Sequence, residues 1–162
     1  MARRGGVELH ESPQAQKSHS KKARLKAVCK ETASYYHLLL MRSSDEEANQ
    51  ARTYLASRNL GGSIPTSWML GFAPGKGRLI THLRSLGFSD EEMIEANVAI
   101  RSGNRVNDRF FNRVMFPIAN VRGEVIAFGG RVIGSGEPKY LNTGDTPLFH
   151  KSEVLYALDK AK

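Results

Sequence analysis

Cysteine and tryptophan are nearly absent from this chain of 162 residues, which has one of each. The single cysteine, Cys29, excludes an internal disulfide and a cysteine-rich zinc site, and it fits a reducing cytoplasm. No run of about 18 apolar residues occurs, so the sequence predicts no membrane span. The first residues are polar and basic, without the apolar stretch of a secretory signal. We therefore expect a cytoplasmic globular protein with no membrane partner.

The sequence also lacks the short motifs of common nucleotide-dependent enzymes. The segment Gly71–Gly77 resembles a phosphate-binding P-loop, but it has three residues between the first glycines where the motif needs four. It also ends in Gly77, where a metal-binding hydroxyl belongs. The segment Phe128–Arg131 lacks the glycine spacing of a dinucleotide-binding turn. Histidines are scattered, and no carboxylate cluster for Mg²⁺ stands out, because the acidic residues outside predicted helix starts are isolated: Asp108, Asp145 and Asp159.

Positive charge, in contrast, is abundant and unevenly distributed. The formal net charge is +8, with +6 over residues 1–30, −2 over residues 31–96 and +4 over residues 97–162. A polyanion is the obvious partner for such a chain, because cations on the protein replace the counterions around phosphates. Taken alone, the lysine-rich segment 14–26 favours a merely solvated, soluble surface over a binding surface.

Hydrophobic spacing predicts helices in the first two thirds of the chain. Residues 1–20 are polar and predict a flexible arm, and a helical stripe of apolar residues begins near Lys21. Further helices are expected over residues 45–58, 63–70, 79–86 and 89–97. Ser89 and Glu92 have the spacing of a capping box, which fixes the start of the last of these helices.

Short apolar runs predict a small sheet in the last third. Residues 114–118 and 124–128 flank an Asn/Gly turn and predict a β-hairpin, and residues 131–133 and 140–142 can add further strand. Pro117 cannot donate to a strand ladder, so its strand should be an edge strand there, or bulged. Helices followed by a small, mostly antiparallel sheet predict an α+β fold, with one folded domain over residues 21–162.

Cations gather at the predicted strand ends. Arg109 and Arg113 have the same strand parity, and Gly129–Gly130 removes two side chains before Arg131, which lets a phosphate or another backbone approach. Guanidinium and ammonium groups bind phosphates, and a tyrosine ring stacks on bases. Solvated strand-end charges are the alternative interpretation of the same residues. The remaining candidates are Lys139, Tyr140 and Lys151.

Ordered motifs across nearly the whole chain are similar to those of one family. The segment Asp108–Ile118 resembles the D-R-F-R-N-R-[IV]-M-F-P-I signature of DnaG-type bacterial primases. Further stretches follow the family's order: Gly6–Leu9, Ala51–Leu60, Leu70–Pro74, Gly123–Arg131, Pro138–Thr143 and Leu148–Lys151. Four positions depart from the family pattern. Phe111 replaces an arginine, Asn59 replaces a glycine, Asp145 replaces a glutamate, and the tryptophan usual after Pro74 is missing.

The resemblance implies a DNA primase, a DNA-dependent RNA polymerase that makes short RNA primers for replication. The chain would be the N-terminal subdomain of its polymerising core, beginning after a zinc-ribbon domain and ending where a TOPRIM subdomain begins. No catalytic or metal-binding residue is then expected here, since Mg²⁺ or Mn²⁺ belongs to the TOPRIM subdomain and Zn²⁺ to the zinc ribbon. The residues expected to contact nucleic acid or nucleotides are Arg58, Arg109, Arg113, Arg131, Lys139, Tyr140, Asn142 and Lys151.

The implied partners are a single-stranded DNA template, the RNA primer and nucleoside triphosphates. A replicative helicase would bind a C-terminal domain outside this chain. The alternative function is a stand-alone module that binds single-stranded nucleic acid without catalysis. A third possibility, an adaptor that uses its basic face on a protein partner, has no sequence feature in its favour.

Overall fold

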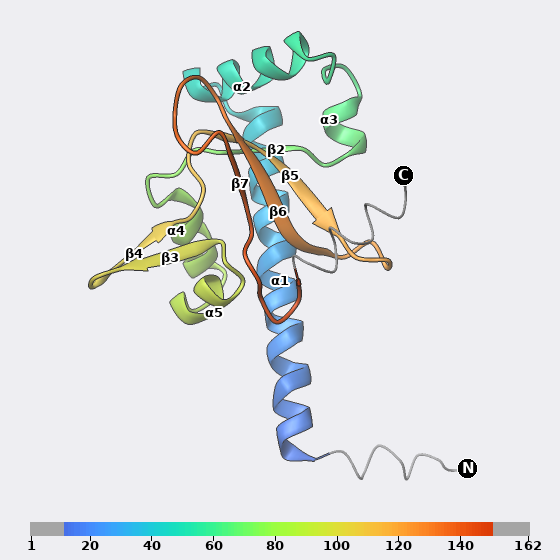
Figure 1. Cartoon of the computed structure of the whole chain (residues 1–162), viewed down its shortest axis with the longest axis vertical. Helices are drawn as coiled ribbons and strands as arrows, with labels where there is room; N and C mark the ends of the chain where they lie inside the picture. The colour runs from blue at the N-terminus through green and yellow to red at the C-terminus, as the bar shows by residue number, and fades with distance from the viewer. Residues whose placement is uncertain (1–11, 151–162) are drawn as a thin grey trace.

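The computed structural model describes residues 12–150, in which helices precede a small antiparallel sheet (Figure 1). This arrangement confirms the predicted α+β fold. No helix among these residues is long and apolar enough to cross a membrane. The elements are α1 (Pro13–Arg42), α2 (Glu46–Ser57), α3 (Ile64–Ser67), β2 (Gly71–Ala73), α4 (Arg78–Ser85), α5 (Asp90–Glu95), β3 (Ala99–Ser102), β4 (Arg105–Asp108), β5 (Arg113–Ala119), β6 (Val125–Val132) and β7 (Tyr140–Asn142).

Helix α1 begins earlier than the apolar stripe predicts. The Ser12 side chain accepts a hydrogen bond from the Ala15 N–H, and Pro13 occupies the first helical position, where its missing N–H costs nothing. The expected start near Lys21 is therefore wrong. Buried residues begin only at Leu25, so the first turns of α1 extend beyond the body of the protein (Figure 1).

The main sheet has the strand order β2-β5-β6-β7, with every neighbouring pair antiparallel. The predicted hairpin is confirmed as β5 and β6, and the Gly123 N–H donates to the Asn120 carbonyl in its turn. Pro117 lies beyond Met115, the last β5 residue paired with β2, and a register shift follows at Ile118/Ala119. Strand β5 is thus an edge at Pro117 and irregular just after it, as the missing N–H requires.

Two strand features have no counterpart in the sequence prediction. Residues 63–70 were expected to be helical up to a glycine terminator, but α3 ends at Ser67 and Gly71 opens the buried strand β2. A Cβ at Gly71 would lie 2.6 Å from the Tyr36 Cβ, so only glycine allows β2 to cross α1 so closely. The second feature is the separate hairpin of β3 and β4.

Helices α4 and α5 form where they were expected. In α5 the Ser89 hydroxyl accepts from the Glu92 N–H and the Glu92 carboxylate accepts from the Ser89 N–H, which confirms the capping box. Helix α4 starts after Gly77, which has no capping side chain. Its start is instead held by Asp108 at the end of β4, whose carboxylate accepts from the Ile80 N–H at 3.2 Å.

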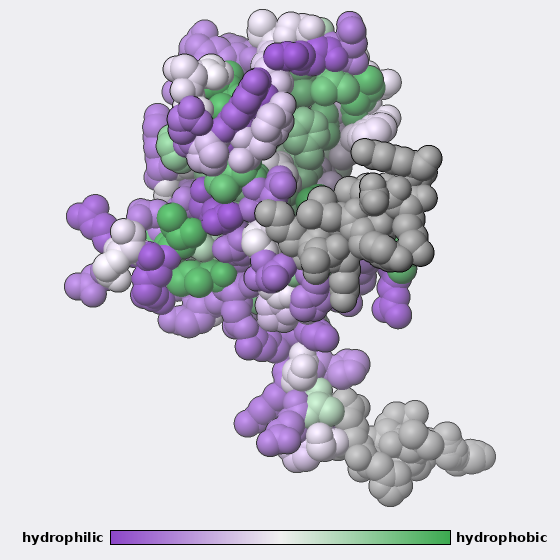
Figure 2. Space-filling model, in the orientation of Figure 1, coloured by the Kyte–Doolittle hydropathy of each residue, from purple (hydrophilic) through white to green (hydrophobic). Residues whose placement is uncertain are grey.

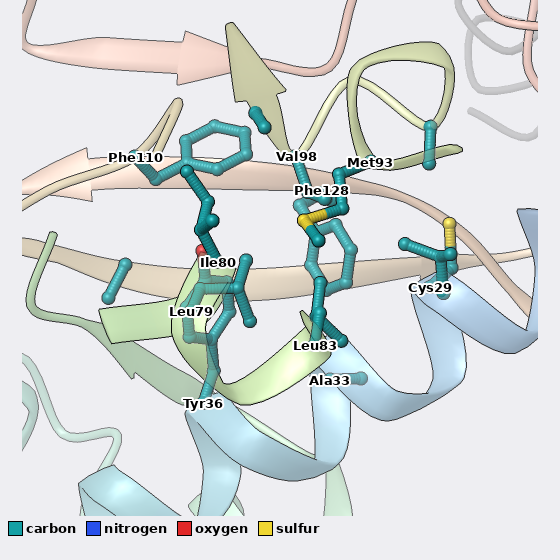
Figure 3. Close-up of a cluster of buried hydrophobic side chains, with 14 of the residues drawn as sticks. Cys29, Ala33, Tyr36, Leu79, Ile80, Leu83, Met93, Val98, Phe110 and Phe128 are labelled. Atoms are coloured by element: carbon teal, nitrogen blue, oxygen red, sulfur yellow. The ribbon is translucent and has the colours of Figure 1, made fainter. Parts of the chain in front are cut away.

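The largest cluster of buried side chains lies where α1, α4, α5 and the sheet meet. Figure 3 shows side chains from these elements in this cluster, including Tyr36 of α1, Leu83 of α4 and Phe128 of β6. A second cluster lies where α2, the end of α1 and the opposite face of the sheet meet, and it contains Leu40, Leu55, Phe72 and Val114. In Figure 2 hydrophobic side chains appear in patches on the upper body, and the surface around the protruding part of α1 is mostly hydrophilic.

Candidate nucleic-acid interface

One row of side chains runs across all four strands of the main sheet. Phe72 pairs with Val114, Val114 pairs with Arg131, and Arg131 pairs with Tyr140. Directly opposite residues of antiparallel strands project from the same face, so these four side chains share the face that carries α2. Phe72 and Val114 are buried there, Arg131 is half-buried, and Tyr140 is 66% exposed. The row therefore changes from core to surface as it approaches the free edge at β7.

The exposed end of this row joins α2 through cation–π contacts. The guanidinium carbon of Arg131 lies 5.0 Å from the ring centroid of Tyr140 and 5.5 Å from that of Tyr54. The guanidinium carbon of Arg58 lies 5.4 Å from the same Tyr54 ring. Cations within about 6 Å of an aromatic face are attracted by its quadrupole. We call Arg58, Tyr54, Arg131 and Tyr140 the cation–aromatic ladder.

The chain reversal after α2 places Arg58 in the ladder. Arg58 is the C-cap, the Leu60 N–H donates to the Leu55 carbonyl at 2.8 Å, and the Asn59 N–H donates to the Ala56 carbonyl at 3.2 Å. These are the two hydrogen bonds of a Schellman motif, which needs a left-handed residue after the cap. Asn59 supplies it with φ of 62°. This explains how asparagine can replace glycine there, since both adopt this conformation more readily than other residues.

Arg113 is buried rather than exposed. Its side chain is on the sheet face toward α1, its residue is 2% exposed, and its Nη1 lies 3.4 Å from the carbonyls of Gly130 and Lys139. A Cβ at Gly130 would lie 3.0 Å from the Arg113 Cδ, so this glycine makes room for the Arg113 side chain and not for a ligand. On the opposite face, a Cβ at Gly129 would lie 3.0 Å from the Asn142 Oδ1.

Arg109 is near Arg113, but not for the reason that strand parity suggests. β4 ends at Asp108 and β5 begins at Arg113, so the two arginines are not on one extended strand. Arg109 Nη2 donates to the Asn142 carbonyl at 2.7 Å and thereby supports strand β7. Burial lowers the pKa of both guanidinium groups, and the neighbouring Arg113 charge further lowers the pKa of Arg109.

The cations of the candidate site have no acidic partners within residues 12–150. These site cations are Arg58, Arg109, Arg113, Arg131 and Lys139. Arginines and lysines elsewhere form ion pairs, such as Arg84 with Asp90, whereas the site cations form none. The buried Nε atoms of Arg109, Arg113 and Arg131 also lack a hydrogen-bond partner. Unneutralised cations beside an exposed ring are suited to phosphate and base contacts.

The structure therefore brings together most of the predicted residues. Arg58, Arg131 and Tyr140 form the ladder, and the exposed residues Lys139 and Asn142 lie beside it on and next to β7. Arg109 contacts the backbone of β7 at Asn142, whereas Arg113 contacts the backbone at Gly130 of β6 and at Lys139, just before β7. Lys151 lies outside the described residues. Sequence reasoning missed Tyr54, because no local signal shows that its ring contacts two cations.

No metal site accompanies these residues. Residues 12–150 contain no group of three or more histidine, cysteine, aspartate or glutamate side chains that could hold a metal ion. Asp108, the most buried carboxylate near the sheet, is used by backbone N–H groups of α4. Desolvation raises the pKa of the Asp108 carboxyl above its ordinary value, although these hydrogen bonds oppose the increase.

Comparison with known proteins identifies the family. The model for the N-terminal domain of the DNA primase catalytic core matches residues 35–162. A DNA primase of Pseudomonas putida is 44% identical over 136 residues, covering 82% of this chain and 20% of the relative. A DNA primase of Listeria monocytogenes is 36% identical over 149 residues, covering 90% of this chain and 24% of the relative. The chain thus spans about a fifth to a quarter of the length of these curated relatives.

Solved structures agree with the sequence relatives. The RNA polymerase domain of Mycobacterium tuberculosis primase DnaG in complex with double-stranded DNA has a TM-score of 0.73 and 34% identity, covering 80% of this chain and 41% of that one. A DnaG primase catalytic domain bound to single-stranded DNA has a TM-score of 0.74 and 34% identity, covering 82% of this chain and 43% of that one. By its matched domain, its relatives and its fold, this chain belongs to the family of DNA primase catalytic-core N-terminal domains.

Proposed function

We propose that the chain is the part of a DNA primase that binds template and nucleotide during RNA primer synthesis. The observation that carries this proposal is the cation–aromatic ladder of a primase-family domain, whose cations form no ion pair among residues 12–150 and whose exposed tyrosine lies on the edge strand β7. The Arg58 and Arg131 guanidinium groups would bind phosphates, and Tyr140 would stack on a base. Both solved structures described above are complexes with DNA, which supports DNA as the partner.

In the reaction we infer, a ribonucleotide 3′-hydroxyl attacks the α-phosphate of the next triphosphate and pyrophosphate leaves. Mg²⁺ or Mn²⁺ would be held by a TOPRIM subdomain in another part of the protein, because the described residues offer no ligand cluster. Lys139 and Arg131 would stabilise negative charge on the triphosphate as it moves to the leaving group. Arg109 and Arg113 would act indirectly, because their contacts are with the backbone of residues 130, 139 and 142.

The remaining parts of the proposed enzyme also lie outside this chain. A zinc-ribbon domain with Zn²⁺ would precede it, and a C-terminal domain would bind the replicative helicase. A primase from Aquifex aeolicus with zinc-binding and RNA polymerase domains is among the structural relatives, at 29% identity and a TM-score of 0.72. The RNA primer and nucleoside triphosphates are the other proposed partners, and the cytoplasm is the proposed location.

The binding part of the proposal is tested by fluorescence anisotropy of single-stranded DNA with the purified chain at several salt concentrations. Weak binding with a steep linear fall in log affinity against log salt is expected, because phosphate contacts dominate. Affinity that does not depend on salt contradicts the electrostatic argument. The chain alone should incorporate no ribonucleotides on a template with Mg²⁺ or Mn²⁺, and templated incorporation would contradict the assignment of the metal site to another subdomain.

Variants of the edge residues test the roles within a full-length primase that contains this chain. Lys151→Ala should reduce primer yield severely, whereas Tyr140→Phe should reduce it little, since the stacking ring remains. Thermal melts of both variants should match the wild type. If Tyr140→Phe reduced primer yield as much as Tyr140→Ala, which removes the whole ring, the hydroxyl group and not stacking would be the important feature.

A further inference from the structure

Helix α1 carries a second concentration of cations, away from the ladder. Lys22, Lys26 and Lys30 are spaced four residues apart, so they lie on one side of the helix. Together with the turn between β5 and β6 they line a hollow of about 790 Å³. The small side chains of Ala23 and Ala27 also line it and leave the space between the lysines open. We call Lys22, Lys26 and Lys30 the lysine row.

The lysine row is only partly neutralised. Lys26 Nζ lies 3.3 Å from the Glu124 carboxylate at the hairpin turn, and the side chains of both residues remain more than a third exposed. Within residues 12–150, Lys22 and Lys30 form no ion pair, whereas Arg24, on the neighbouring side of the helix, is bound by Glu92 of α5. Among residues 12–150, Lys21 and Arg24 are thus paired with glutamates at α5. Lys22 and Lys30, which line the hollow, form no ion pair in this part of the chain.

The geometry selects an extended anion over a small one. Lys22 and Lys30 are eight residues apart, which corresponds to about 12 Å along the helix axis. A single phosphate contacts both only if the two side chains bend toward each other, whereas a chain of phosphates can contact both in extended conformations. Three lysines around the hollow also disfavour an apolar segment, because burying their charges without partners is costly.

The lysine row is a separate surface from the ladder. Leu40 of α1 packs in the same cluster as Tyr54, so it marks the height of the ladder along the helix. The helix rises about 21 Å from Lys26 to Leu40. A nucleic-acid strand would therefore have to extend along the protein to contact both surfaces.

We propose that the lysine row binds the phosphate backbone of nucleic acid as a second contact, additional to the ladder. The identity of the polyanion rests on the proposed function, since a primase-family domain acts with DNA. The row itself supplies only sequence-independent contacts, because lysine ammonium groups bind phosphates as point charges.

The decisive measurement is the salt dependence of binding to a long single-stranded oligonucleotide, for the whole chain and its variants. The double variant Lys22→Gln/Lys30→Gln should lower the slope of log affinity against log salt by about 1.4, which is about 0.7 for each phosphate that is no longer neutralised. Lys22→Arg/Lys30→Arg should keep the wild-type slope. Lys17→Gln is the matched control, because at 3.6 residues per turn it lies on the opposite side of α1 from Lys26 and does not line the hollow.

The outcomes separate this inference from the proposed function. An unchanged slope in the double variant with a normal thermal melt overturns the lysine row as a nucleic-acid contact. If Lys139→Ala lowers the slope in the same experiment, the proposed function stands without the second surface; if neither variant does, both fail. Loss of binding to a polyglutamate peptide in the double variant, with DNA binding unchanged, would assign the row to an acidic protein partner and overturn the proposal.

Discussion

Tyr54 offers the sharpest test of the ladder, because one ring contacts two cations from distant parts of the chain. Arg58 lies 5.4 Å and Arg131 lies 5.5 Å from its centroid. A cation–π contact is worth about 0.5–1 kcal/mol at an exposed site and about 2 kcal/mol when desolvated. Arg58 is exposed and Arg131 is half-buried. Replacing Tyr54 by leucine should therefore remove about 1–3 kcal/mol of interactions that orient the two guanidinium groups.

We expect only part of this interaction energy to appear as a loss of DNA affinity, because the two guanidinium groups can still reach a ligand without the ring. We expect Tyr54→Leu to weaken binding of single-stranded DNA by about three- to tenfold, since a tenfold change corresponds to about 1.4 kcal/mol. Tyr54→Phe keeps the ring and should bind within about twofold of the wild type. Leucine still fills the apolar site beside Leu55 and Leu70, so both variants should melt close to the wild type.

The assay is anisotropy of labelled single-stranded DNA at several salt concentrations, with a thermal melt of each variant. A smaller salt slope for Tyr54→Leu would show that a cation no longer neutralises a phosphate, which a simple defect in packing would not produce. Wild-type affinity and slope in Tyr54→Leu would refute the positioning role. Equal damage from Tyr54→Phe would refute it as well, because the ring would then not be the part that matters.

Further predictions concern the phosphate contacts, the turn after α2 and the response to acid. Arg131→Ala and Lys139→Ala should each reduce primer synthesis at least about tenfold in a full-length primase with an unchanged melt, because a charge-assisted contact is worth about 1.5–3 kcal/mol. Asn59→Ala should destabilise the fold by about 1 kcal/mol in denaturant titrations, since alanine tolerates φ of 62° poorly, whereas Asn59→Gly should be nearly neutral. The hydrogen-bonded Arg24 guanidinium lowers the pKa of Glu92 to about 2, so this contribution to stability is complete above the ordinary value of 4.5 and is lost as the pH falls through about 2. Glu92→Gln should therefore flatten the acid limb of a plot of stability against pH.

Each of these predictions has an outcome that contradicts it. Wild-type priming by Arg131→Ala and Lys139→Ala would place the binding surface elsewhere. An Asn59→Gly variant as unstable as Asn59→Ala would show that the side chain, and not the backbone conformation, stabilises the turn. For the acid limb, Glu91→Gln is the control, because Glu91 is in the same helical turn but its side chain is 75% exposed. If both variants flatten the limb equally, the Arg24 contact is not its cause.

The sequence predicted those parts of the fold whose signals are local. The capping box of Ser89 and Glu92 and the Asn/Gly turn of the β5–β6 hairpin each need only a few neighbouring residues, and both are confirmed. Strand β2 could not be predicted in this way, because its three residues are held by pairing with residues of β5 that lie 40 to 44 positions later. Its first residue, Gly71, resembles a helix terminator in sequence, although its role is to let β2 pass α1. The start of α1 did have a local signal, the Ser12–Pro13 pair, which the polar composition of residues 1–20 obscured.

For the candidate site, the sequence likewise predicted local features but not contacts between distant residues. The identity of Arg58, Arg131 and Tyr140 followed from motifs, since each lies in a short stretch similar to the family. Their contacts did not, because Tyr54 and Arg131 are separated by 77 positions and meet only through the packing of α2 on the sheet. For Arg113 the local pattern was misleading. Strand parity over residues 109–113 does not apply, because β5 begins only at Arg113, and the Arg113 side chain is buried against Gly130.

The row from Phe72 to Tyr140 links the stability of the fold to the orientation of the candidate binding residues Arg131 and Tyr140. Val114 is a core residue and also the direct cross-strand neighbour of Arg131, so there is no intervening layer to absorb a change in its volume. Close-packed interiors transmit such changes to their neighbours. Substitutions at Phe72 or Val114, far from any solvent, would then alter how Arg131 meets a ligand. Under the proposed function, the core and the candidate binding surface cannot vary independently, because a change of volume at Phe72 or Val114 would also alter the ligand contacts proposed for Arg131.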